Sequence, residues 1–502
     1  MTRSEKIALV ISLLAIFITA WISYNIFQGI PHLEDEFAYV WQAKAITQGK
    51  LSIPSPPEYK SFLVPFVVDY EGQRFGKYPI GWPIMLSLGE RIRLPWLVNP
   101  FLAGLAVWLT FRLCSKLINE NAGVLAAALT ATSPFFLMNS GSLLSHSWGL
   151  VLSTVFAISW LDSIEKQRKV PEWIPPVVAG LTMGLLALTR PFTALGVAIP
   201  FGVHGIISLI HGAPNTRKRI IAIGIVALVI GSLHFVWQYA ATGDPFLNPY
   251  TLWWEYDKIG FGPGIGVTEQ GHTLRIAWDN LKITMNSAYS DLFGWFKISW
   301  LFIPFGLWSL RENRKSWVII SVAPALIVLY LGYWIGAWAL GPRYYFESLY
   351  SLTILTSAGI FWLAGWKLKP GDDICRGYNL KQLRPTVVII MVALLVGSNL
   401  AFYTPHRIGG MRGLYGTSRG QLEPFLKSGE GVVTPALVIV DTDEWRKYAG
   451  LLELASPTLD SPWIFIWNRG PKSTARVIEA FPDRQVYYYS PETPWVLYTK
   501  PQ

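Results

Sequence analysis

The sequence predicts a polytopic α-helical membrane protein that ends in a small α/β domain outside the membrane. Of its 502 residues, 52% are hydrophobic and only 15% are charged, whereas about a quarter of an average soluble protein is charged. Eleven apolar stretches approach the roughly 20 residues that a helix needs to cross a bilayer. The chain after residue 404 instead alternates short strand and helix patterns.

The eleven predicted transmembrane helices occupy most of residues 1–403. A shorter apolar stretch, at 79–90, is expected to lie at the membrane interface. A cleaved signal peptide is the alternative for the first stretch, but its apolar run is long and no A-x-A cleavage site follows. The predicted spans lie near residues 7–27, 96–118, 121–139, 145–161, 173–189, 193–210, 220–240, 293–310, 317–335, 346–366 and 385–403.

Charge and cysteine content exclude other classes of protein. The net charge of +10 would suit a nucleic-acid partner, but the basic residues follow the predicted spans, so no nucleic acid is expected as a partner. The two cysteines, Cys114 and Cys375, are too few for a disulfide scaffold or a Cys-rich zinc site. Both are expected at the cytoplasmic face, where a disulfide is disfavoured.

The positions of the basic residues predict the orientation, because positive residues concentrate in cytoplasmic segments. With the N-terminus inside, Lys and Arg crowd the inner segments, whereas the short outer turns near 140–145, 190–192 and 336–345 hold only Arg190 and Arg343. We therefore expect a multi-pass protein of the cytoplasmic membrane whose C-terminal domain is extracytoplasmic. Its long outer loops, 28–95 and 241–292, are expected to carry function.

Three acidic residues, Glu34, Asp35 and Glu36, directly follow the first predicted span. They open a helical pattern that predicts an amphipathic helix on the membrane surface. Helix capping and a favourable helix dipole would explain one or two of the acids. Three acids beside anionic lipid exceed that need, so we expect a functional role for at least one of them.

Basic residues at three outer positions are candidates for an anion site. Lys77 precedes the interfacial stretch, Arg190 lies in a Thr-Arg-Pro turn, and Arg343 lies in a Gly-Pro-Arg-Tyr-Tyr turn. Each could be an interface anchor or a snorkelling side chain. Each could instead bind a lipid phosphate as a charged hydrogen-bond donor. Because the positive-inside rule disfavours Arg190 and Arg343, a compensating function is favoured for them.

Histidines and tyrosines add further candidates for the same site. His146 lies in an outer turn, His272 lies in the second outer loop, and Tyr344 and Tyr345 follow Arg343 directly. A lone histidine is more often a hydrogen-bonded structural residue than a site residue. No cofactor is required by the sequence, and a divalent metal ion is an open alternative, with candidate ligands His32, Asp35 and His146.

The C-terminal segment predicts a small domain with a largely parallel sheet. Strands are expected at 436–440, 463–467, 485–489 and 495–499, and helices at 444–454 and 474–481. The segment contains no nucleophile elbow, P-loop or metal motif. Docking of an acceptor, or stability, is therefore the expected role of this domain.

Four features together resemble a known class of enzyme. An Asp-Glu pair follows the first span, a Lys-x-Pro segment closes the same outer loop, an Arg-Tyr-Tyr turn precedes a late span, and a soluble domain follows the last span. This layout resembles the GT-C class of membrane glycosyltransferases, in the branch of the protein O-mannosyltransferases and the lipid A aminoarabinose transferase. The resemblance implies a transmembrane catalytic domain over residues 1–403 and an extracytoplasmic domain over 404–502.

The resemblance also implies a reaction and the residues that perform it. The donor would be a polyprenyl-phosphate-linked sugar, and the acceptor a hydroxyl group of a cell-envelope lipid, glycan or protein. Asp35, with Glu36 beside it, matches the family's catalytic base. Lys77 matches a lysine associated with the lipid phosphate, although Tyr78 stands where the family has Pro. His146 stands near the place of the family's second acidic residue.

This chemistry is consistent with the residues present. A hydroxyl group becomes a good nucleophile when a carboxylate takes its proton, and the leaving lipid phosphate needs cations, which Lys77, Arg190 and Arg343 would supply. Direct displacement by a hexosyl- or pentosyltransferase would invert the anomeric carbon. A multi-span transporter is the alternative function, but it should place ionisable residues at mid-membrane and show repeat symmetry.

Overall fold

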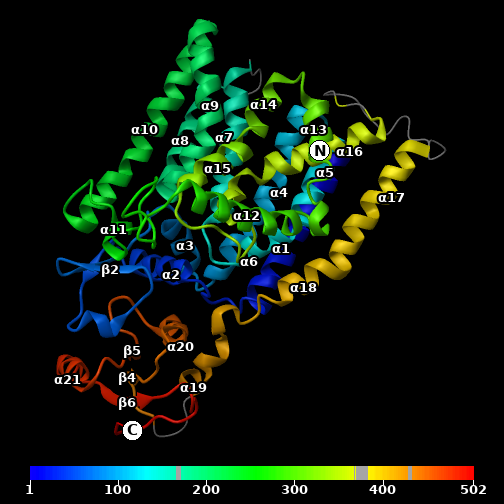
Figure 1. The fold of residues 1–502 in the computed structure, drawn as a ribbon. Coiled ribbons are helices and arrows are strands. Elements are labelled where there is room, and N and C mark those ends of the chain that lie inside the picture. Colours follow the sequence, from blue (N-terminus) through cyan, green and yellow to red (C-terminus); the bar gives the residue numbers. More distant parts are fainter. Residues whose placement is uncertain (166–170, 367, 369–382, 428–431, 502) are drawn as a thin grey trace.

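The computed structural model describes residues 1–165, 171–366, 368, 383–427 and 432–501 (Figure 1). Cys375 and several basic residues that predict the orientation, among them Lys169 and Arg376, lie outside the described residues. The described chain forms a bundle of helices, a layer of short elements at one end of that bundle, and a small domain with a sheet beyond that layer (Figure 1).

The bundle makes the chain a multi-pass membrane protein. Among the described residues, eight helices are long and apolar enough to cross a membrane, and the bent pair α5 and α6 would be a ninth. Two further predicted stretches form shorter apolar helices, so each predicted stretch is helical but fewer than eleven reach full length. The eight are α1 (Arg3–Asn25), Pro95–Leu117 with α4 (Val98–Leu117), α7 (His146–Ile164), α9 (Pro191–His211), α10 (Pro214–Thr242), Arg314–Gly332 with α14 (Arg314–Ile320) and α15 (Val322–Leu329), Arg343–Ala364 with α16 (Leu349–Ala364), and Leu383–Leu426 with α17 (Leu383–Ser398).

The shorter helices have local causes. The helix α5 (Glu120–Ala131) meets α6 (Pro134–Gly141) at an angle of 60°, because Pro134 cannot continue the hydrogen-bond ladder of α5. The helix α8 (Ile174–Thr189) is separated from Pro191, the first residue of α9, by Arg190 alone. The 3-10 turn Phe296–Ile298 precedes α13 (Ile303–Leu310). Proline and tight turns therefore shorten these predicted spans.

Small residues let helices at the centre of the bundle approach closely. A Cβ atom on Gly359 of α16 would lie 2.1 Å from the carbonyl oxygen of Phe302, and one on Gly306 of α13 would lie 2.0 Å from that of Leu355. Such close contact is typical of helix pairs in membranes. The helix α16, which the Arg343 turn precedes, is thereby fixed at the centre, whereas α17 lies at the side of the bundle (Figure 1).

The layer at the end of the bundle is built around α2 (Glu34–Thr47), which α3 (Gly81–Arg91) packs against. Every residue of α2 from Glu36 to Ala43 is buried, so the expectation of an amphipathic helix lying on the membrane surface is wrong. An antiparallel sheet with the strand order β1-β3-β2 lies in the same loop and was not predicted. Its strands are β1 (Ile53–Pro54), β2 (Val67–Tyr70) and β3 (Gln73–Gly76).

The C-terminal domain has the predicted parallel sheet. The strands β4 (Ala436–Val440), β5 (Trp463–Trp467) and β6 (Gln485–Tyr489) pair in the order β5-β4-β6. The expected helices are α20 (Trp445–Ala449), which a 3-10 turn extends to Leu454, and α21 (Pro471–Ala480). The expected strand at 495–499 is wrong, because that segment makes only one bridge, between Tyr488 and Tyr498.

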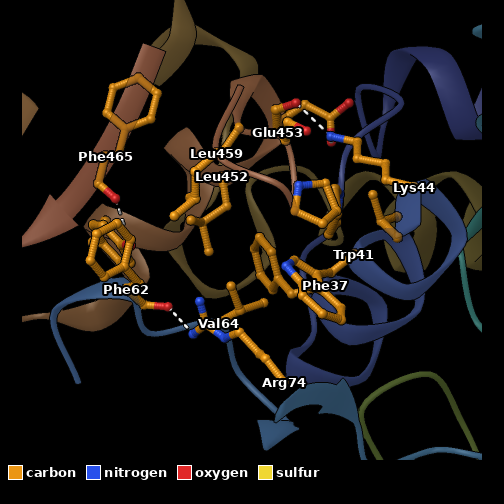
Figure 2. Close-up of a pocket in the computed structure, with 16 residues that line it drawn as sticks. Phe37, Trp41, Lys44, Phe62, Val64, Arg74, Leu452, Glu453, Leu459 and Phe465 are labelled. Atoms are coloured by element: carbon orange, nitrogen blue, oxygen red, sulfur yellow. Dashed lines mark hydrogen bonds and ion pairs between the residues drawn. The ribbon is translucent and has the colours of Figure 1, made fainter. Parts of the chain in front are cut away.

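The C-terminal domain packs against one side of α2, as Figure 2 shows. The ring of Phe37 packs edge-on against Trp445 at 6.3 Å, and the ammonium group of Lys44 donates to the carbonyl oxygen of Glu453 at 2.7 Å. The space between the two parts is only about 30 Å³, about one water in size, so it is a gap in packing. The helix α2, whose first turn carries Asp35, is therefore packed between α3 and the C-terminal domain.

Candidate active site

A cavity of about 390 Å³ lies where the ends of α2, α8, α9 and α10 meet the second outer loop and the turn before α16. Its size is within the range of ligand sites. Five of the residues proposed from the sequence line it, namely Asp35, His146, Arg190, Arg343 and Tyr344. Side chains from widely separated parts of the chain thus meet at one cavity.

Asp35 presents its carboxylate to this cavity from the first turn of α2. Its Oδ1 atom accepts a hydrogen bond from the hydroxyl of Tyr78, and its Oδ2 atom lies 3.2 Å from Nη1 of Arg343. The N-terminal end of a helix also favours a negative charge. The carboxylate is therefore held in place by one neutral donor and one cation at the cavity wall.

Glu36 does not line the cavity, which corrects its prediction as a catalytic residue. Its side chain is buried, and its two oxygens accept backbone N–H bonds from His32 at 2.7 Å, Leu33 at 3.0 Å and Leu143 at 2.7 Å. Burial raises the pKa of Glu36 to about 6, and the three N–H donors oppose that rise. Glu36 therefore caps its own helix and ties α2 to the turn that precedes α7.

The two arginines at the cavity have different partners. Arg343 faces Asp35, whereas Nε of Arg190 lies 3.0 Å from Oε1 of Glu347. Arg190 also donates to the hydroxyl groups of Ser145 at 3.3 Å and Tyr330 at 3.4 Å. Both guanidinium groups reach the cavity wall, so the site presents two cationic forks of the kind that bind phosphate oxygens.

Glu347 is a site residue that the sequence reasoning missed. It is completely buried, and its Oε1 atom also lies 3.4 Å from Nδ1 of His146. Gly149 leaves room for the side chain of Glu347, because a Cβ atom on Gly149 would lie only 2.7 Å from Oε1 of Glu347. His146 therefore lines the cavity, and its Nδ1 atom faces a buried carboxylate.

Lys77 does not line the cavity, although it was expected at the lipid phosphate or at the interface. Its Nζ atom lies 3.1 Å from Oδ2 of Asp257, and both side chains are buried. The same atom lies 3.7 Å from the ring centre of Phe66 and within 5.3 Å of three more aromatic rings. Burial lowers the pKa of Lys77, and the charge of Asp257 opposes that change. Lys77 is therefore neither a snorkelling side chain nor a residue that reaches the cavity.

The remaining candidates lie away from the cavity. The ring of His272 stacks on Phe261 at 5.0 Å, and its Nε2 atom lies 2.8 Å from the carbonyl oxygen of Leu331. Tyr345 is buried behind Tyr330. These contacts assign structural roles to His272 and Tyr345 in place of the predicted site roles.

The candidate metal ligands do not come together. His32 is buried with its Nδ1 atom 2.9 Å from the carbonyl oxygen of Ile30, while Asp35 and His146 have the separate partners given above. Across the described ranges, no three His, Cys, Asp or Glu side chains group as metal ligands would. The part of the chain that the structure describes therefore does not fit a metal centre.

Tyrosines form much of the cavity wall, and the sequence analysis singled out only Tyr344 among those that do. Tyr78 contacts Asp35, and the ring of Tyr330 stacks on that of Tyr344 at 4.8 Å. Tyr39 lies in α2, four residues after Asp35, whereas Tyr78, Tyr250 and Tyr330 come from distant elements that no local pattern could bring together. The further tyrosines of the wall are Tyr39, Tyr250 and Tyr333.

Comparison with known proteins identifies the fold but not a sequence family. No family model and no curated protein sequence matches the chain. The solved structure of ArnT from Cupriavidus metallidurans bound to undecaprenyl phosphate superposes with a TM-score of 0.57 at 12% identity, over 95% of this chain and 89% of ArnT. The oligosaccharyltransferase of Archaeoglobus fulgidus in its apo form gives a TM-score of 0.55 at 13% identity, over 91% of this chain. The chain has the GT-C fold.

The GT-C fold predicted from the layout of the sequence is thus confirmed. The chain spans only 64% of the length of that archaeal enzyme. AglB of the same organism, in complex with an inhibitory peptide and a dolichol-phosphate, gives a TM-score of 0.53 at 12% identity, over 96% of this chain and 69% of AglB. At these sequence identities the structural similarity shows the fold alone and does not identify the substrates.

Proposed function

We propose that this GT-C protein is an inverting glycosyltransferase that moves a sugar from a polyprenyl-phosphate donor to a hydroxyl acceptor. The reaction would take place at the outer face of the cytoplasmic membrane, with Asp35 as general base. The observation that carries the proposal is the ion pair of Asp35 and Arg343 at the wall of a ligand-sized cavity. Such a pair brings together a base and a phosphate-binding cation.

The donor phosphate would compete with Asp35 for Arg343. Two oxygens of a phosphate group can accept from a guanidinium group in the same bidentate way as a carboxylate, so the arriving donor replaces Asp35 as its partner. The carboxylate of Asp35 then keeps the hydrogen bond from Tyr78 and faces the acceptor. Arg190, whose charge is partly offset by Glu347, adds a second cation at the same wall.

The displacement then follows from these positions. The acceptor oxygen attacks the anomeric carbon, and its proton moves to the carboxylate of Asp35. The bond between the anomeric carbon and the phosphate oxygen breaks, and the electron pair leaves with polyprenyl phosphate, whose charge the arginines stabilise. A single displacement at carbon inverts the anomeric configuration.

A lipid-linked donor fits the surroundings of the cavity. The cavity wall includes His234 and Phe235 of α10, whose neighbouring residues Leu233 and Val236 are exposed and apolar. An apolar chain that leaves the cavity on this side would meet the hydrocarbon of the bilayer. The ArnT structure of the same fold is bound to undecaprenyl phosphate, which belongs to the class of lipid phosphate that the proposed donor would release.

The test uses the full chain in nanodiscs with a panel of polyprenyl-phosphate sugars. We expect the release of polyprenyl phosphate, detected by mass spectrometry, from at least one donor, and a loss of at least about a hundredfold in Asp35→Asn. Glu34→Gln is the matched control, because Glu34 is the neighbouring acid and faces Arg446 at 4.0 Å. Full turnover in Asp35→Asn would remove Asp35 as base. If the protein neither releases polyprenyl phosphate nor binds any donor saturably, the proposal is contradicted and a transporter is favoured.

A further inference from the structure

The turn that carries Arg343 is held by hydrogen bonds from two helices that do not line the cavity. The carbonyl oxygen of Leu340 accepts from Nδ2 of Asn139 in α6 at 2.8 Å. The carbonyl oxygen of Ala339 accepts from Nη2 of Arg407 at 3.1 Å. Arg407 lies in α18 (Thr404–Gly409), the short helix between α17 and the C-terminal domain. The position of this turn is therefore set from outside the site.

Arg407 is itself fixed by a buried acid. Its Nε atom lies 3.0 Å from Oδ1 of Asp291 and its Nη2 atom lies 3.1 Å from Oδ2, which is the bidentate geometry of a strong pair. The hydroxyl of Tyr403 donates to the same carboxylate at 2.7 Å. Asp291 is the last residue of α12 (Leu274–Asp291) and is only 2% exposed. Arg407 thus joins the end of the second outer loop to the Arg343 turn.

The turn has little room to move between these anchors. Gly341 has a φ of +75°, which a residue with a side chain rarely adopts. A Cβ atom there would lie 2.8 Å from the ring of Phe135 and 3.4 Å from Oδ2 of Asp291. The amide of Arg343 donates to the carbonyl oxygen of Gly341 at 2.8 Å. A shift of the Ala339 carbonyl would therefore be passed on to Arg343.

We propose that Arg407 is a positioning residue for Arg343, and that it sets the distance between the guanidinium group of Arg343 and the carboxylate of Asp35. The inference rests on the proposed function, because it assigns Arg343 to the donor phosphate. Arg407 touches neither the cavity nor the reacting atoms. It acts by fixing the backbone four residues before Arg343. The segment that enters the C-terminal domain thereby contributes to the phosphate site.

A double-mutant cycle tests this coupling. Undecaprenyl phosphate is the probe, and its affinity is measured on the full chain in nanodiscs for Arg343→Ala, Arg407→Ala and the two changes combined. We expect each single change to weaken binding by about tenfold and the combination to be no weaker than Arg343→Ala, because both remove the same contact. Additive losses, or unchanged affinity in Arg407→Ala, would overturn the inference.

Two further variants separate positioning from simple destabilisation. Arg412→Ala removes an equally charged residue of the same segment, whose Nη2 atom donates to the carbonyl oxygen of Asn25 at 3.0 Å, and should leave the affinity unchanged. If Arg407→Ala does not fold, Arg407→Lys replaces it, because lysine keeps the charge but cannot bond Asp291 and Ala339 as a fork. Unchanged affinity in a folded Arg407→Lys would then overturn the inference. If Arg343→Ala leaves the affinity unchanged, the phosphate role of Arg343 fails, and this inference fails with it.

Discussion

The carboxylate of Glu347 lies 3.0 Å from Nε of Arg190 and is completely buried. Removal of one partner of such a pair leaves the other charge buried without compensation, which costs about 3–5 kcal/mol. We therefore expect Glu347→Gln to lower the free energy of unfolding by about 3 kcal/mol, measured by denaturation in detergent. Glu312→Gln is the control, because Glu312 is 86% exposed and pairs with Arg311 at the surface. Equal stability of the two variants would show that Arg190 does not depend on Glu347.

Glu36 accepts three backbone N–H bonds in a buried position. In Glu36→Gln the amide nitrogen cannot accept a hydrogen bond, so at least one backbone donor loses its partner, at a cost of about 1–3 kcal/mol. We expect a lower unfolding midpoint together with reduced turnover, since Asp35 is the preceding residue. Wild-type stability in Glu36→Gln, measured in parallel with Glu34→Gln, would contradict this structural role.

Stability should decrease as the pH rises from about 4.5 to 7, because Glu90 of α3 is largely buried. Burial raises its pKa to about 7, with Lys44 opposing and Glu453 adding to the rise. A carboxyl group whose pKa is raised in the folded state holds its proton more tightly there. Its ionisation therefore costs stability progressively across this window, by up to about 3 kcal/mol.

Unfolding midpoints at pH 5 and pH 7.5 measure this effect. Glu90→Gln removes the titrating group, so its stability should vary less between the two pH values. Glu36, whose pKa is raised to about 6, contributes in the same direction and remains in the variant. An identical pH dependence in the wild type and Glu90→Gln would show that Glu90 is ionised without cost in the folded protein.

The buried pair of Lys77 and Asp257 should matter for stability, and Lys77, which unlike Asp257 does not line the cavity, should not bind the donor phosphate directly. Lys77→Met leaves Asp257 buried and uncompensated, so we expect a loss of about 3 kcal/mol in unfolding free energy. Combining it with Asp257→Asn removes the uncompensated charge and should restore part of that loss. The affinity of the folded double variant for undecaprenyl phosphate should stay within about twofold of the wild type. A tenfold loss would return Lys77 to the phosphate site.

The features that could be predicted from the sequence are those with a hydrophobic pattern over neighbouring residues. The apolar runs predicted the helical bundle, and the alternation in 436–489 predicted the parallel sheet of β4, β5 and β6. The strands β1 to β3 have only two to four residues each, too few for a periodic pattern to be visible. Elements of this length form because their neighbours position them.

Residues of the candidate site could be proposed from the sequence mainly where a charged side chain stood near the end of a predicted span. Asp35, Arg190 and Arg343 stand at or beside helix ends, and the structure brings all three to one cavity. The role of Lys77 depends on Asp257, which is 180 residues away, so spacing gave no sign of it. Glu347 did have a signal, because an acid at the start of a predicted span is rarely there without a partner.

The cover that the C-terminal domain provides for α2 has a consequence for protein engineering. Phe37 and Trp41 are almost fully buried against the domain side of the helix. If the domain were exchanged for that of another protein with this fold, the new domain would meet a surface shaped for Trp445 and Glu453. A working chimera therefore needs the outward surface of α2 to be transferred together with the domain, as a single matched part.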